Sequence, residues 1–152
     1  MYNRILVAVD GSATSLRGLD EAIRLAKATS AKLMIVHVVN ELLSADFTAG
    51  AYYETFIESM REAGAKVLEH ATAVARRADI PCEQKLLEAI GGRPANLIVE
   101  QATDWQADLI VLGTHGRRGL KRLALGSDAE LVLRMSPVPV LLVRDRPEAL
   151  QE

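Results

Sequence analysis

Short apolar runs alternate with amphipathic stretches along most of the chain. Residues 5–9, 33–36, 109–112 and 138–143 are apolar at nearly every position and rich in β-branched side chains. Runs of this length and composition are typical of strands that are covered on both faces. The more polar stretch Cys82–Ala89 predicts a fifth strand, which we expect at an edge of the sheet.

Between these runs, apolar side chains recur every three or four residues, which is the period of an amphipathic helix. In the first such segment this period places Leu16, Leu19 and Ile23 on one stripe. In the third, Pro94 occupies a first-turn position that helices favour. The predicted helices span residues 13–29, 53–78, 94–103 and 128–134.

The predicted elements follow the order βαβαβαβαβ along the chain. This order indicates an α/β fold, namely an open five-stranded parallel sheet with helices on both faces. A length of 152 residues suits one domain, which we assign to residues 1–146 with a C-terminal tail at 147–152.

Two of the predicted strands end in turns whose residues could bind a ligand. The first predicted strand ends in Asp10-Gly11-Ser12, and the fourth ends in Gly113-Thr114-His115-Gly116. Open parallel sheets bind ligands beyond the carboxyl ends of their strands, where the strand order reverses. If both turns serve one ligand, the first and fourth strands must be neighbours. We therefore expect the strand order 3-2-1-4-5.

Composition and charge exclude several classes of function. Eighteen basic residues face twenty acidic ones, for a net charge of −2, which argues against a general nucleic-acid binder. The single cysteine excludes an intramolecular disulfide and a cysteine-based zinc site. No apolar run approaches the roughly 20 residues that span a bilayer. The first residues lack the layout of a signal peptide, so we expect a cytoplasmic protein without membrane contact.

Residues 113–127 have the features of a phosphate-binding loop. The segment carries glycines that let a backbone approach a ligand closely, and it ends at Gly126-Ser127, where a helix is predicted to begin. Free amides and the dipole at a helix N-terminus favour an anion. Four basic residues and no acidic residue lie within the loop: Arg117, Arg118, Lys121 and Arg122. Neither a Walker motif nor a GxGxxG motif is present.

The glycine spacing of this loop resembles a family signature. Gly113, two residues, Gly116, nine residues and Gly126-Ser127 match the G-2x-G-9x-G-S/T signature of the ATP-binding universal stress protein family. Residues 5–12, with the sequence ILVAVDGS, are similar to that family's first strand and acidic turn. Residues 36–39 and 137–144 resemble the end of its second strand and its closing strand, so the resemblance covers nearly the whole chain.

The resemblance implies that ATP or another adenine nucleotide, with Mg²⁺ or Mn²⁺, lies between the first and fourth strand ends. Asp10 would then bind the ribose hydroxyls, as an ionised carboxylate can. Ala8 and Val38 would flank the adenine, with Val38 using its backbone. The glycines of the signature and Ser127 would hold the phosphates. The full candidate set comprises Ala8, Asp10, Ser12, Val38, Gly113, His115, Gly116, Arg117, Gly126, Ser127 and Asp128.

The family also implies a homodimer that pairs through the last strand, with Val138, Val140 and Leu142 as contact candidates. Such a protein would act in the stress response as a nucleotide-dependent regulatory dimer, with slow ATP hydrolysis at most. One alternative is a dimeric interaction scaffold of the same type that holds no nucleotide. Another is an ATP-splitting synthetase, although Asp10-Gly11-Ser12 does not match the Ser-Gly-Gly style of pyrophosphate loop in those enzymes.

Asp128 departs from the family pattern, which commonly has a small apolar residue after Gly-Ser. A carboxylate beside a triphosphate repels it unless a metal ion or nearby arginines screen the charge. The departure bears on the affinity and on the number of phosphates accepted. Asp128 has a second interpretation, in which it helps to hold the metal ion against the phosphates.

Several of these residues also have a purely structural interpretation. Ser127 and Glu130 have the spacing of a capping box, and Asp10 has the chemistry of an N-cap for the first helix. His115 and the basic residues of the loop suit a solvated surface. We further expect a hydrogen-bonded core role for His37, surface exposure for His70, packing roles for Cys82 and Trp105, and a turn at Gly91-Gly92.

Overall fold

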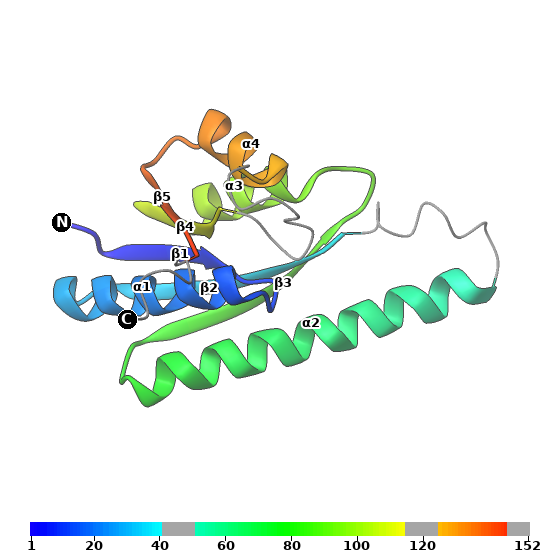
Figure 1. The fold of residues 1–152 in the computed structure, drawn as a ribbon, viewed down its shortest axis with the longest axis horizontal. Coiled ribbons are helices and arrows are strands. Elements are labelled where there is room, and N and C mark those ends of the chain that lie inside the picture. Colours follow the sequence, from blue (N-terminus) through cyan, green and yellow to red (C-terminus); the bar gives the residue numbers. More distant parts are fainter. Residues whose placement is uncertain (41–50, 115–124, 146–152) are drawn as a thin grey trace, which may run out of the picture.

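The computed structural model describes residues 1–40, 51–114 and 125–145. Five strands and four helices alternate in these ranges, as Figure 1 shows. In chain order they are β1 (Arg4–Ala8), α1 (Ala13–Thr29), β2 (Lys32–Asn40), α2 (Ala51–Arg77), β3 (Cys82–Ala89), α3 (Pro94–Asp104), β4 (Leu109–Gly113), α4 (Ser127–Met135) and β5 (Val140–Val143).

The strands form one parallel sheet in the order β3-β2-β1-β4-β5, which confirms the predicted topology. β1 lies at the centre, with Ile5 opposite Leu33 of β2 and Leu109 of β4. β3 and β5 are the two edges, so the more polar strand is at an edge as expected. The strand order reverses between β1 and β4, where the two chemically distinctive turns begin.

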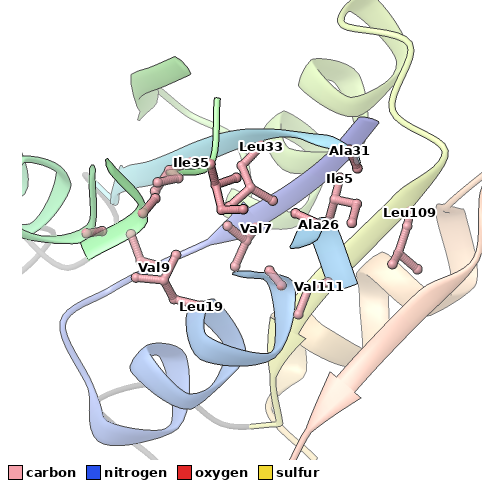
Figure 2. Close-up of a cluster of buried hydrophobic side chains, with 14 of the residues drawn as sticks. Ile5, Val7, Val9, Leu19, Ala26, Ala31, Leu33, Ile35, Leu109 and Val111 are labelled. Atoms are coloured by element: carbon pink, nitrogen blue, oxygen red, sulfur yellow. The ribbon is translucent and has the colours of Figure 1, made fainter. Parts of the chain in front are cut away.

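Helices cover both faces of the sheet. α1 and α2 lie on one face, and α3 and α4 lie on the other (Figure 1). Alternate residues of β1 therefore enter different cores: Ile5 and Val7 pack with α1 and α2, whereas Leu6 packs with α3 and α4. Figure 2 shows the first of these cores, where Leu19 of α1 meets Val9 and the central strands. Burial on both faces explains why these strands are apolar at successive positions.

Some element boundaries differ from the predicted ones. β2 continues to Asn40, because it pairs with β3 as far as Asn40 opposite Ala89. The last strand begins at Val140 rather than at 138, since Val138 is engaged in a local turn with the Ser136 hydroxyl. Pro139 has no amide to donate, although its carbonyl accepts from Ile110.

Within the described ranges, every helix is too short or too polar to cross a membrane. The same ranges contain no group of three or more histidine, cysteine, aspartate or glutamate side chains arranged to hold a metal ion.

Candidate functional site

The turns after β1 and β4 begin side by side at one edge of the sheet. Val7 of β1 is paired with Val111 of β4, so both strands reach their carboxyl ends at the same level. After β4, the Thr114 amide donates to the Val143 carbonyl of β5 (3.0 Å), and the Gly126 amide donates to the Thr114 carbonyl (2.6 Å). The start of α4 is thereby fixed to the end of β4.

Asp10 is held in a tight turn between β1 and α1. Its Oδ1 accepts a hydrogen bond from the Ser12 amide (2.8 Å), and its own amide donates to Ser15 Oγ (3.2 Å). Gly11 between them has a φ of 83°, a conformation that favours glycine. The second carboxylate oxygen of Asp10 makes no hydrogen bond within the described part of the chain, so this half-buried group can accept donors from a ligand.

The interpretation of Asp10 as the N-cap of α1 is wrong. Ser12 is the N-cap, because its Oγ accepts from the Ser15 amide (3.2 Å) and its carbonyl accepts from the Leu16 amide (3.0 Å). The carboxylate of Asp10 reaches only the amide two residues on, which makes an Asx turn before the helix. The Ser12 hydroxyl therefore accepts the cap bond, while its O–H has no acceptor among the described residues.

Gly113 allows α1 to approach the end of β4 closely. A Cβ at this position would lie 3.0 Å from Thr14 Cγ2 and 3.1 Å from the Thr14 carbonyl carbon. Thr14 itself is buried in the first turn of α1. The glycine thus allows the turn after β1 to pack against the end of β4.

An apolar floor lies beside the Asp10 turn. Ala8 and Val38 are half-buried and pack against the core under α3 and α4, as does Leu87, which is paired with Val38. These residues follow fully buried positions on the same face, such as Leu6 and Val36. A flat apolar group can lie against them while its polar substituents reach Asp10.

The predicted capping box at the start of α4 is wrong. Gly126 is the N-cap, Ser127 is the first helical residue, and no side chain caps the helix. The Gly126 amide is fixed to Thr114, and the Gly126 carbonyl accepts the first helical bond from the Glu130 amide (2.9 Å), so the helix begins one residue earlier than a Ser127 cap requires. Glu130 instead pairs with Arg134 (2.8 Å). Ser127 is exposed, and the first amides of α4 have no partner within the helix.

Arg93, which the sequence did not single out, contacts Asp128 across two helix starts. Arg93 Nη2 lies 3.5 Å from Asp128 Oδ1, and both side chains are about half exposed. Asp128 Oδ1 itself is buried and has no hydrogen-bond partner among the described residues. The pair joins the residue before Pro94 to the first turn of α4, so a positive charge partly screens the carboxylate. The adjacent glycines of the Gly91-Gly92 turn are the signal that Arg93 precedes a helix start.

Three members of the candidate set, His115, Gly116 and Arg117, lie outside the described residues, as do Arg118, Lys121 and Arg122. Among the structural interpretations, His70 is exposed as expected, and His37 hydrogen-bonds through Nδ1 to the Val9 carbonyl (2.7 Å). Cys82 and Trp105 pack against the two cores.

One strong ion pair lies near the carboxyl end of β3. Arg61 of α2 holds Glu88 with two hydrogen bonds, Nε to Oε1 and Nη2 to Oε2 (3.2 Å). The hydrogen bonds from Arg61 keep the pKa of Glu88 below its ordinary value, although partial burial opposes this shift. The pair attaches α2 to the edge strand beside the site.

Sequence comparison relates the chain to one family along its length. The family model described as the universal stress protein family matches residues 1–144. The universal stress protein YxiE of Bacillus subtilis is 38% identical over 151 residues, covering 95% of this chain and all of that protein. The universal stress protein MJ0531 of Methanocaldococcus jannaschii is 35% identical over 144 residues, covering 95% of this chain and 83% of that protein.

Structure comparison gives the same relation. A universal stress protein family member from Burkholderia pseudomallei is 33% identical with a TM-score of 0.78, covering 95% of this chain and 97% of that one. A universal stress protein solved in complex with cAMP is 30% identical with a TM-score of 0.67, covering 94% of this chain and 97% of that one. One from Archaeoglobus fulgidus solved with dAMP is 26% identical with a TM-score of 0.65, covering 94% of this chain and 98% of that one.

Proposed function

The chain belongs to the universal stress protein family, and from this premise we propose that it binds an adenine nucleotide between the carboxyl ends of β1 and β4. The observation that carries the proposal is the juxtaposition of the Asp10 turn, the end of β4 and the start of α4 at one sheet edge. Relatives solved with cAMP and dAMP support the ligand class.

The nucleoside part of the ligand has a matching surface. The adenine lies against the half-buried side chains of Ala8 and Val38, and the backbone of Val38 hydrogen-bonds to the polar edge of the base. The ribose hydroxyls donate to Asp10, whose Oδ2 is left open when Oδ1 accepts from Ser12. Both groups come from the central strands, so the surface is held in place before the ligand arrives.

The phosphates lie at the start of α4. Gly126, Ser127 and the first amides of this helix supply donors to an anion, and the helix dipole has its positive end there. Gly113, Gly116, His115 and Arg117 complete the predicted phosphate loop, with Mg²⁺ or Mn²⁺ as the counter-ion of a triphosphate. Ser12 Oγ accepts the cap bond of the turn that carries Asp10, and its O–H can still donate to the ligand.

We assign the chain a binding and regulatory role in a homodimer. β5 is an edge strand whose residues are all half-buried, and a second copy of the strand would cover this edge. Val138, Val140 and Leu142 pack against the core under α3 and α4, so their contribution to a dimer is through the remaining exposed surface. Nucleotide binding would then alter the loops around the site in both protomers.

Calorimetric titration of the purified protein with ATP, ADP and AMP, each with Mg²⁺, tests the proposal. Chromatography of the supernatant after denaturation shows whether nucleotide co-purifies. Saturable binding of at least one nucleotide is expected, together with a rise in the melting temperature. Absence of binding, of co-purified nucleotide and of thermal stabilisation would contradict it.

Such an outcome would instead favour a dimeric interaction scaffold without nucleotide. One observation speaks for that alternative, because Asp128 in the first turn of α4 has a buried oxygen without a hydrogen-bond partner among the described residues. The pair with Arg93 reduces this negative charge without supplying a hydrogen bond to the oxygen.

A further inference from the structure

We propose that His37 is the residue that positions Asp10 for ligand binding, acting from the opposite face of the sheet. Its imidazole fixes the carbonyl of Val9, which belongs to the peptide bond that joins Val9 to Asp10. The inference rests on the proposed nucleotide site and assigns that site a positioning residue that does not touch the ligand.

The hydrogen bond of His37 continues where the pairing of β1 with β2 ends. The Val9 amide donates to the Val36 carbonyl (2.9 Å), and the Val9 carbonyl lies 2.7 Å from His37 Nδ1. A carbonyl oxygen only accepts, so Nδ1 must carry the proton. Both the amide and the carbonyl of Val9 are therefore hydrogen-bonded to β2, immediately before the chain turns at Asp10.

The imidazole is confined on its other side by α2 and β3. A Cβ built on Gly64 of α2 would lie 2.7 Å from His37 Cδ2 and 3.1 Å from Nε2, and 2.8 Å from Leu86 Cδ1. Leu86 is the β3 residue paired with His37. The ring is thus packed against a helix that has no side chain at this point. A glycine in the middle of a 27-residue helix is otherwise unfavourable, which indicates that the space is needed.

His37 has no direct access to the proposed nucleotide. Its ring lies against Gly64 of α2, whereas Ala8 and Val38 pack toward α3 and α4. Figure 1 shows α2 on the opposite face of the sheet from α3 and α4. Its influence passes through one peptide group to Asp10, whose amide and Oδ1 are bound to Ser15 and Ser12. Releasing the Val9 carbonyl frees the first link of this turn and lets the carboxylate depart from its position.

Two substitutions separate the hydrogen bond from the ring. His37→Phe keeps a ring against Gly64 but removes the donor, and His37→Asn keeps a donor near the position of Nδ1 but removes the ring. His70→Phe, at an exposed position of α2, is the matched control. Calorimetry with ATP and with AMP is combined with amide hydrogen exchange at Ser12, which reports the turn without any ligand.

His37→Phe is expected to lower the affinity for both ATP and AMP by about three- to tenfold and to speed amide exchange at Ser12 by a similar factor. This change corresponds to the loss of one neutral hydrogen bond. His37→Asn should keep the nucleotide affinity and the Ser12 exchange rate close to those of the wild type. His70→Phe should change neither the affinity nor the exchange rate. In an Asp10→Ala background, His37→Phe should no longer affect affinity, whereas a merely structural role would leave its effect unchanged.

Unchanged Ser12 exchange in His37→Phe overturns the proposal, regardless of nucleotide. Faster exchange with unaltered affinity also overturns it, because the turn would then not matter to the ligand. If the wild-type chain binds no nucleotide, the proposed function fails and so does the ligand half of this inference. The exchange data still decide whether His37 sets the turn.

Discussion

At the scale of single residues, the carboxylate of Asp10 has one oxygen committed to the chain and one left for a ligand. The committed oxygen accepts from the Ser12 amide, and the turn is completed by Ser15 and Gly11. This division would let one aspartate hold the turn and still accept a hydrogen bond from the proposed ligand. It also predicts that the side chain matters more to the ligand than to the fold.

Asp10→Ala should therefore lower nucleotide affinity by about ten- to hundredfold, the range for hydrogen bonds to a charged group. Asp20→Ala, which removes an exposed acidic residue on α1, is the control for the change in net charge and should leave affinity unaltered. The measurement is calorimetric titration of both variants with AMP. Equal affinity of the Asp10 variant and the wild type would remove Asp10 from the site.

Asp128 is expected to affect how strongly the site prefers ATP over AMP. Its carboxylate lies in the first turn of α4 and is only partly screened by Arg93 at 3.5 Å. Asp128→Asn should raise the affinity for ATP relative to AMP by about fivefold, because about 1 kcal/mol of like-charge repulsion is removed. Glu130→Gln, exposed on the same helix and paired with Arg134, is the control. A fall in ATP affinity on Asp128→Asn would favour its interpretation as a metal ligand.

At the scale of elements, alanine substitution of two glycines in helix interiors is expected to change the stability in opposite directions. In α1, a Cβ on Gly18 would meet its nearest neighbours at 3.7 Å, which is ordinary contact. In α2, a Cβ on Gly64 would lie 2.7 Å from His37. His37 cannot withdraw without loosening its bond to the Val9 carbonyl, so the crowding is not relieved by a simple side-chain rotation.

Gly18→Ala should stabilise the fold by up to about 1 kcal/mol, from the helix propensity of alanine. Gly64→Ala should instead destabilise it by about 1–3 kcal/mol, because the added carbon overpacks the contact between α2 and the sheet. Urea denaturation of the two variants measures both free energies. Stabilisation by Gly64→Ala would show that His37 is not confined.

Element boundaries show how far local patterns reach. Residues 13–29 were predicted as α1 to the residue, since the stripe ends at a left-handed Ser30 that no helix continues. The apolar pattern at 33–36 covers only part of β2, because the last residues of the strand depend on pairing with β3, a contact between distant segments. The capping box failed for a similar reason: the bond from Gly126 to Thr114 decides where α4 begins, and the local sequence does not contain it.

At the scale of the whole molecule, the strand order followed from one functional argument rather than from periodicity. Two turns that serve one ligand must be adjacent, and β1 and β4 are indeed neighbours. The Arg93–Asp128 pair and the Val9 carbonyl as the partner of His37 could not be predicted from the sequence, because each contact joins residues far apart in the chain.

The edge position of β5 carries a prediction about assembly. If a second copy covers this edge, light scattering should give twice the monomer mass of 16.5 kDa, and the melting temperature should rise with protein concentration. A monomeric mass with a concentration-independent melting temperature would contradict the dimer while leaving the nucleotide site unaffected.

The ends of β1 and β4 are proposed to hold one nucleotide between them. The most direct measurement is a crystal structure of the protein grown with AMP. We predict the ribose hydroxyls on Asp10, the adenine against Ala8 and Val38, and the phosphate at the start of α4. A nucleotide bound elsewhere, or this sheet edge filled by the chain's own side chains, would contradict the account.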